Sequence, residues 1–124
     1  MDKKRILAVD DAPSVTQTLK TALEGTGHFE VREVNEPAQA IPAALSFRPD
    51  LILLDYMMPD LDGGTIAAYL QADASLKRIP VIFVTDMVQE GEEEALGEVL
   101  GGYPFVPKSA GIEAVIRAVE SKLR

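Results

Sequence analysis

Three carboxylates, a hydroxyl and an amine follow short apolar segments of this chain. Asp10 and Asp11 come directly after one segment, Asp55 after a second and Thr85 after a third, and Lys108 is the second residue after a fourth. Carboxylates brought together would repel one another and raise their own pKa values unless a cation lay between them. Oxygen ligands with no histidine or cysteine at hand favour Mg²⁺, which also binds phosphate oxygens. The five residues could therefore form a magnesium-dependent site for phosphoryl chemistry.

Asp55 is the candidate acceptor of a phosphoryl group. It ends the most apolar segment, and carboxylates can form acyl-phosphates. Asp10 and Asp11, predicted to lie in a loop, suit the metal ion better, while a lysine and a hydroxyl would stabilise the charge of the transferring group. Each residue alone has a commoner explanation, because acidic pairs before a proline usually cap helices and strand-end threonines or lysines usually face solvent. Only their combination favours chemistry.

Parallel strands would bring these residues together, since ligands of an open parallel sheet bind beyond the carboxyl ends of its strands. Three segments are apolar without alternation, which is typical of central strands covered on both faces. Two others suit edge strands, because one alternates and the other contains a proline. Pro104 and Pro107 lie an odd number of positions apart, so the last strand should be short or irregular. The five predicted strands are residues 6–9, 29–32, 51–54, 81–84 and 103–106.

Apolar residues recur at helical spacing between these strands and after the last one. Asn35 and Asp62 are candidate caps of the second and third helices, and Pro42 predicts a kink or a late start of the second. Tyr69 and Phe47 are expected at the core or its edge. The predicted helices are residues 13–24, a stretch after residue 35, residues 62–71, part of 90–100, and residues 112–123.

The helix predicted within residues 90–100 is the weakest. Gly91 and Gly97 each cost about 1 kcal/mol relative to alanine, and three successive glutamates at 92–94 repel one another. Strand and helix nevertheless alternate five times along the chain. With right-handed crossovers this order gives an α/β fold, a doubly wound parallel sheet with helices on both faces.

Composition excludes several functions. The length of 124 residues predicts a single domain, residues 1–124, and the net charge of -8 disfavours direct contact with nucleic acid or an anionic membrane. The first apolar run stops at Val9, too short for a signal peptide or a membrane span. With no cysteine, disulfides and thiolate zinc sites are excluded, which fits a reducing compartment with the cytoplasm as the default.

Taken together, the motifs resemble the receiver domain of bacterial two-component response regulators, from Lys4 to about Leu123. Residues 53–63, Leu-Leu-Asp-Tyr-Met-Met-Pro-Asp-Leu-Asp-Gly, are similar to the acceptor motif of that family, and residues 6–11 are similar to its strand with an acidic pair. This resemblance implies a flavodoxin-like fold, with five strands in the order 2-1-3-4-5 and five helices. It also implies a signalling domain that catalyses only its own phosphorylation and dephosphorylation.

The same resemblance implies roles for the acidic residues. Asp55 would take the phosphoryl group from a phosphohistidine of a sensor histidine kinase or a phosphotransfer protein. Asp11, Asp55 and the main-chain carbonyl of Met57 would bind Mg²⁺ directly, and Asp10 would act mostly through a water molecule.

A two-state switch would follow phosphorylation. Thr85 would move toward the phosphoryl oxygens, Lys108 would neutralise one of them, and Phe105 matches the switching aromatic of the family. The change would reach a surface formed by the fourth helix, the fifth strand and the fifth helix. Its reader would be a downstream protein or a C-terminal output domain, and the resemblance leaves open a dimer that forms on phosphorylation.

Departures from the family pattern support an alternative function. Asp86 stands where a small residue is usual after the threonine, and Pro107 precedes Lys108 where a proline usually follows the lysine. The alternative is a receiver with impaired phosphorylation that acts as a constitutive protein-interaction module. Separately, Met57 and Met87 would flank the path of the attacking water with apolar side chains, so we expect slow hydrolysis of the acyl-phosphate.

Two other classes share part of the pattern. Haloacid-dehalogenase-like phosphatases also use an aspartyl nucleophile after a buried strand, but they need a second acid two residues later, where this chain has Met57. A flavodoxin-like carrier would place its flavin phosphate against Asp10 and Asp11, where hydroxyls and backbone amides are required. Both classes fit this sequence less well than the receiver.

Overall fold

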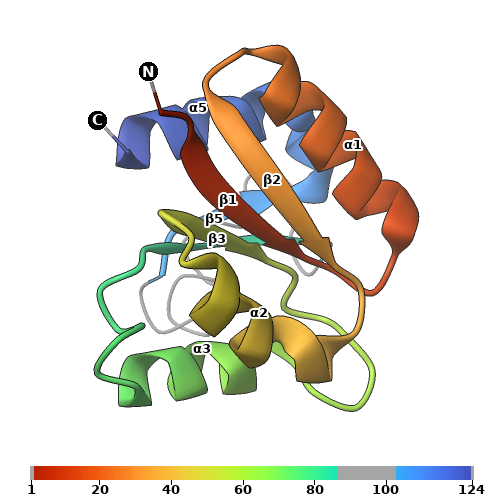
Figure 1. The fold of residues 1–124 in the computed structure, drawn as a ribbon. Coiled ribbons are helices and arrows are strands. Elements are labelled where there is room, and N and C mark those ends of the chain that lie inside the picture. Colours follow the sequence, from red (N-terminus) through yellow and green to blue (C-terminus); the bar gives the residue numbers. More distant parts are fainter. Residues whose placement is uncertain (1, 87–102, 124) are drawn as a thin grey trace.

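The structure, a computed structural model, describes residues 2–86 and 103–123. Within them, five parallel strands form one sheet in the order β2-β1-β3-β4-β5, as predicted (Figure 1). The two strands that were expected at the edges, β2 and β5, lie at the edges. The strands are β1 (Lys4–Val9), β2 (Phe29–Val34), β3 (Leu51–Leu54), β4 (Val81–Thr85) and β5 (Phe105–Pro107).

Helices cover both faces of the sheet, with α1 and α5 on one side and α2 and α3 on the other (Figure 1). The helix expected within residues 90–100 lies outside the described residues. None of the helices in the described part of the chain combines the length and apolar character needed to cross a membrane. The α-helices are α1 (Pro13–Gly25), α2 (Ala40–Phe47), α3 (Gly63–Ala72) and α5 (Ile112–Lys122), with short 3₁₀ helices at Pro37–Gln39 and Lys108–Ala110.

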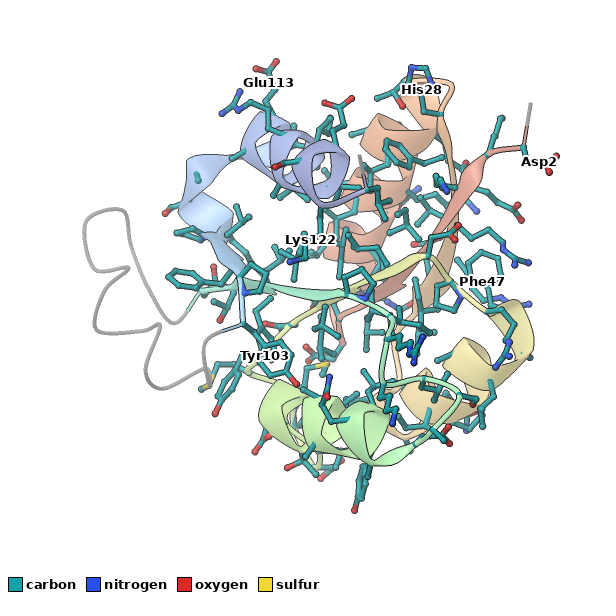
Figure 2. The ribbon with its side chains drawn as sticks, turned by 90° about the vertical axis from the view of Figure 1, so that its left-hand side faces the viewer. Asp2, His28, Phe47, Tyr103, Glu113 and Lys122 are labelled. Carbon is teal, nitrogen blue, oxygen red and sulfur yellow. The ribbon has the colours of Figure 1, made fainter. Side chains whose placement is uncertain are left out.

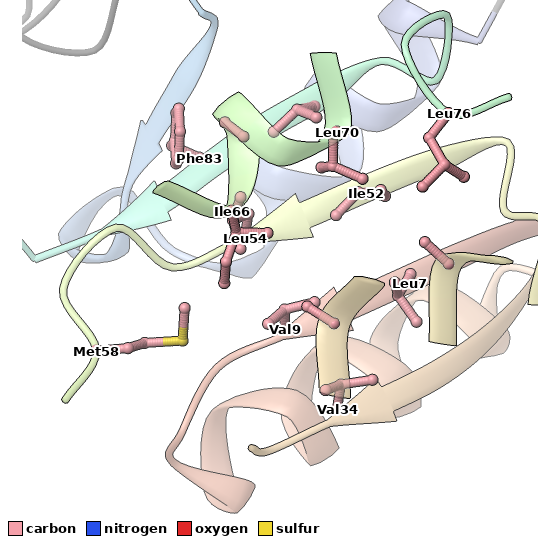
Figure 3. Close-up of a cluster of buried hydrophobic side chains, with 14 residues drawn as sticks. Leu7, Val9, Val34, Ile52, Leu54, Met58, Ile66, Leu70, Leu76 and Phe83 are labelled. Carbon is pink, nitrogen blue, oxygen red and sulfur yellow. The ribbon is translucent and has the colours of Figure 1, made fainter. Parts of the chain in front are cut away.

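Alternate residues of the central strands enter two separate cores, which explains why these strands are apolar throughout. In β1, Ile6 packs toward α1 and α5, and Leu7 packs toward α2 and α3. Figure 3 shows the second core, in which Leu54 of the sheet lies beside Ile66 of α3. Both faces of the sheet are therefore packed against helices, and this packing supports the residues that follow the carboxyl ends of the strands.

Local rules explain most element boundaries. Asp62 caps α3 by accepting a hydrogen bond from the Thr65 amide at 2.8 Å, as predicted. The expected late start at Pro42 is also confirmed, because α2 begins at Ala40 and places the proline in its first turn, where an amide has no helical partner. β5 has only three residues and excludes Pro104, so it is short as predicted.

Two sequence-based expectations were wrong. Asn35 makes no capping hydrogen bond, because its side chain is used elsewhere; Glu36 stands at the start of the 3₁₀ turn. Tyr69 is 56% exposed and does not face the core. At about 100° per residue it lies roughly 110° from the middle of the stripe that α3 buries. Phe47, in contrast, is partly buried at the edge of the core, as expected.

Candidate functional site

The carboxyl ends of β1, β3 and β4 lie side by side, and this arrangement collects the predicted residues. In the parallel register Val9 pairs with Leu54, so Asp10 and Asp55 leave neighbouring strands at the same level. The Asp55 amide donates a hydrogen bond to the Val9 carbonyl at 2.9 Å. His28 is exposed and lies, like Asp2, at the amino ends of the strands, away from this group (Figure 2).

Asp10 is buried and held from several directions. Its amide donates to the Val34 carbonyl at 3.0 Å, which ties the end of β1 to β2. Oδ1 of its side chain accepts a hydrogen bond from the Ala12 amide at 2.9 Å, and Oδ2 lies 2.9 Å from Nζ of Lys108. This carboxylate therefore has a fixed orientation before any ligand binds.

Asp55 is 4% exposed and sits in a tight turn. Oδ1 accepts a hydrogen bond from the Met57 amide at 3.3 Å, and Oδ2 lies 3.6 Å from Nζ of Lys108. The turn needs a glycine at position 63, since a Cβ there would collide with the Asp55 carbonyl oxygen and lie 2.8 Å from Cα of Tyr56. The amino terminus of α3 therefore packs closely against the backbone of Asp55, the residue after β3.

Burial, more than any other cause, raises the pKa of Asp55 from its usual 3.8 to about 6. The charge of Asp10 contributes to this rise, and Lys108 and the Met57 amide oppose it, so that about 6 is the net value. A buried carboxylate with such a raised pKa gains from any added positive charge. A bound cation would therefore lower this pKa and favour the ionised form of Asp55.

Lys108 reaches this group although the proline precedes it. Pro107 ends β5 opposite Thr85, and a 3₁₀ turn beginning at Lys108 follows directly. Burial lowers the pKa of Lys108, but the hydrogen bond to Asp10 and the charges of Asp55, Asp10 and Asp86 outweigh it, so its pKa lies above the ordinary value. Lys108 is therefore a charged amine shared among three carboxylates.

Asp86 is the third of these carboxylates. Its side chain is 77% exposed, yet Oδ2 lies 3.9 Å from Nζ of Lys108, compared with 3.6 Å for Asp55. Asp86 thus faces solvent at the rim of the site while remaining within reach of the lysine.

Asp10, Asp11 and Asp55 could hold a divalent cation. One carboxylate oxygen from each lies within 4.8 Å of the other two. Ligands on opposite sides of Mg²⁺ are about 4.2 Å apart, so small shifts of these oxygens would suffice. Asp11 is exposed, which leaves room for water ligands, and the side chain of Met57 is also exposed. The donor set of hard oxygens fits magnesium.

The predicted switch residues lie on the neighbouring strands. Thr85 is completely buried at the end of β4. Phe105 is partly buried on β5, opposite Phe83. The ring of Phe83 makes edge-to-face contacts with two tyrosines, with 5.5 Å between ring centroids in each pair. One is Tyr56, the residue after Asp55, and the other is Tyr103, which precedes β5 (Figure 2).

One residue near the site was not identified as such from the sequence. Asn35 follows the last residue of β2 and donates a hydrogen bond from Nδ2 to the main-chain oxygen of Asp10 at 2.9 Å. The rule that identified the other residues, polar side chains directly after strands, would have selected it too. It was interpreted as a helix cap because asparagine is common in both places.

Comparison with known proteins agrees with this geometry. The family described as the response regulator receiver domain matches residues 6–120. The chain is 33% identical over 122 residues to the DNA-binding response regulator MtrA of Mycolicibacterium smegmatis, covering 98% of this chain and 51% of that protein. It is 32% identical over 119 residues to the protein PilH of Pseudomonas aeruginosa, covering 96% and 97% respectively.

Solved structures show the same fold. The signal receiver domain of a signal transduction histidine kinase from Syntrophus aciditrophicus superposes with a TM-score of 0.82 at 29% identity, over 97% of this chain and 89% of that one. The chemotaxis protein CheY4 of Vibrio cholerae superposes with a TM-score of 0.80 at 22% identity, over 97% and 98%. The chain spans about half the length of the MtrA proteins that it matches. From the family match and these relatives, the chain belongs to the receiver domains of two-component response regulators.

Proposed function

We propose that this receiver accepts a phosphoryl group on Asp55 from a phosphohistidine of a sensor histidine kinase or a phosphotransfer protein. One observation carries the proposal: the buried Asp55 carboxylate lies 3.6 Å from an amine and within 4.8 Å of two further carboxylates. A buried acid that only stabilised the fold would not be surrounded by like charges. We further propose that residues 1–124 form a single receiver domain.

In the proposed reaction, an oxygen of ionised Asp55 attacks phosphorus. A P–O bond forms and the P–N bond of the donor breaks, so the histidine nitrogen keeps the electron pair and takes up a proton. Lys108 neutralises an oxygen of the transferred group, and Thr85 donates a hydrogen bond to another. Because the acceptor is itself covalently modified, each molecule accepts one phosphoryl group per signal. The only reactions that the domain catalyses are its own phosphorylation and dephosphorylation.

Magnesium is the cation that fits the three carboxylates. When bound, it would compensate their charge and that of the phosphoryl oxygens. Asp11, Asp55 and the main-chain carbonyl of Met57 would hold it, with Asp10 acting through water. Asp10 is already engaged by Lys108 at 2.9 Å, which suits a more distant role.

Output would follow from a change around β5. Thr85 pairs with Pro107 in the sheet, so a movement of the threonine toward the phosphate would also shift β5, the strand that carries Phe105. The surface of β5 and α5, together with the helix expected from the sequence within residues 90–100, would then change its affinity for a partner. That partner is either a separate protein or a C-terminal output domain, and a dimer that forms on phosphorylation is a further outcome.

Asp86 favours a second candidate function. Its carboxylate lies 3.9 Å from Lys108 and competes with Asp55 for that amine. If the competition prevents phosphoryl transfer, the domain would act as a constitutive interaction module whose surface is independent of phosphorylation.

A mass measurement separates the two functions. The wild-type protein is incubated with Mg²⁺ and a small-molecule phosphodonor, and its intact mass is recorded. Phosphorylation predicts the mass of one added phosphoryl group, which Asp55→Asn abolishes. Asp50→Asn, at the opposite end of the sheet, serves as the control and should still gain it. No added mass on the wild type would favour the interaction module.

A further inference from the structure

Asn35 lies at the carboxyl end of β2, next to the strand that carries the acidic pair. Its Nδ2 donates two hydrogen bonds, to the main-chain oxygen of Asp10 at 2.9 Å and to Oγ1 of Thr16 at 2.9 Å. A side-chain amide has two N–H hydrogens on one nitrogen, so it can serve both acceptors at once. A carboxylate or an alkyl side chain at this position could do neither.

Thr16 fixes the direction of that amide. Its side chain is completely buried, and its hydroxyl donates to Oε1 of Glu33 at 2.8 Å, with the Pro13 carbonyl at 3.2 Å as a longer alternative. Because the single hydroxyl hydrogen points toward Glu33 or Pro13, the oxygen lone pairs accept from Asn35. The result is a chain of bonds that ends on a charged acceptor and polarises each donor in turn.

The Asp10 carbonyl that Asn35 binds belongs to the peptide between Asp10 and Asp11. The amide of Asp10 is already fixed by Val34, and its side chain by Ala12 and Lys108. The Asn35 bond adds the last constraint, the orientation of the peptide plane that leads into Asp11. Asp11 itself is exposed, so its position depends on this backbone more than on packing around its side chain.

We propose that Asn35 is a positioning residue for the cation site: it sets the direction of the Asp10–Asp11 peptide and thereby the affinity for Mg²⁺. It acts through the main chain and does not contact the ion. This inference rests on the proposed function, because it assumes that Asp11 and Asp55 bind the cation. Residues that orient metal ligands typically change affinity by about 10–100-fold when they are replaced.

The test is a calorimetric titration of Mg²⁺ into folded wild type and variants. Asn35→Ala is expected to bind Mg²⁺ about tenfold more weakly, and Asn35→Gln, which keeps the amide donor, should recover part of the loss. Thr16→Val, which replaces the hydroxyl that orients the amide by a methyl group, should weaken binding by a smaller factor than Asn35→Ala does. Thr18→Ala provides a matched control, because this hydroxyl on the same helix donates to the Ser14 carbonyl and its removal should leave affinity unchanged.

A second readout distinguishes positioning from a loss of structure. In the phosphodonor assay, Asn35→Ala should raise the Mg²⁺ concentration for half-maximal rate about tenfold, while the rate at saturating Mg²⁺ stays within about twofold of wild type. Wild-type affinity in Asn35→Ala, or a reduced saturating rate with unchanged half-saturation, would overturn the inference. A wild type that binds Mg²⁺ but is not phosphorylated would refute only the proposed function.

Discussion

Replacing Asp55 by asparagine is expected to stabilise the protein above about pH 7 when no divalent cation is present. The pKa of Asp55 is raised from 3.8 to about 6, chiefly by burial. Between these values the folded state binds a proton that the unfolded state has released, so stability falls as pH rises through this range. At about 1.4 kcal/mol per pKa unit, the ionised carboxylate costs about 3 kcal/mol of unfolding free energy. An amide has no charge to desolvate and avoids this cost.

Urea denaturation followed by circular dichroism, with a chelator present, measures the effect. At about pH 8 the variant should exceed the wild type by about 3 kcal/mol, and the difference should shrink to about 0.5 kcal/mol at about pH 4, where the folded-state carboxyl is protonated and the unfolded-state carboxyl is only about half ionised. Adding Mg²⁺ should stabilise the wild type more than the variant, because in the proposed function the ion binds the folded protein through this carboxylate.

Asp73→Asn is the matched control with the opposite sign. Hydrogen bonds from the hydroxyl and amide of Ser75 lower the pKa of Asp73, so its charge favours the folded state and its removal should decrease stability. The reasoning would be refuted if Asp55→Asn were no more stable than wild type at pH 8, or if its advantage did not depend on pH.

Three further predictions concern the same site. Gly63→Ala should lower the unfolding free energy by about 1–3 kcal/mol, measured by denaturation, because the new methyl group collides with the Asp55 carbonyl; unchanged stability would contradict the close contact. Asp86→Ala should speed phosphorylation, followed by intact mass, by no more than about fivefold, because an exposed ion pair with Lys108 is worth at most about 1 kcal/mol. An increase of two orders of magnitude would show that Asp86 strongly impairs the wild type. Finally, the phosphoryl group should persist for much longer than seconds, and Met57→Asn should shorten its lifetime by giving the attacking water a polar neighbour; a wild-type lifetime of seconds would contradict the hypothesis of slow hydrolysis.

The order and type of the elements were predictable because their signals are local. A run such as residues 51–54 can be apolar throughout only if both faces of the strand are covered, and the structure divides these residues between two cores. Asp62 caps its helix through a bond that spans three residues. The second methionine of the hydrolysis hypothesis, Met87, lies outside the described residues, so the structure adds nothing there.

Side chains that could serve two purposes were harder to assign. Asparagine caps helices and also bridges backbone groups, and only the position of Asp10 beside Asn35 decided between the two. Tyr69 lies at helical spacing from the buried Ile66, but it stands roughly 110° from the middle of the stripe that α3 buries, and its side chain is exposed.

The sequence by itself determined which residues follow the strands and predicted that three acidic side chains would meet and favour a cation, because strand periodicity and charge are properties of the chain. Only the tertiary structure decided how close these side chains lie to one another and which carboxylates share the Lys108 amine. Lys108 and its three carboxylates come from segments far apart in sequence, and so do the residues that bury Asp55 and raise its pKa. Their electrostatic interactions depend on through-space separation and local dielectric, which no pattern along the chain specifies.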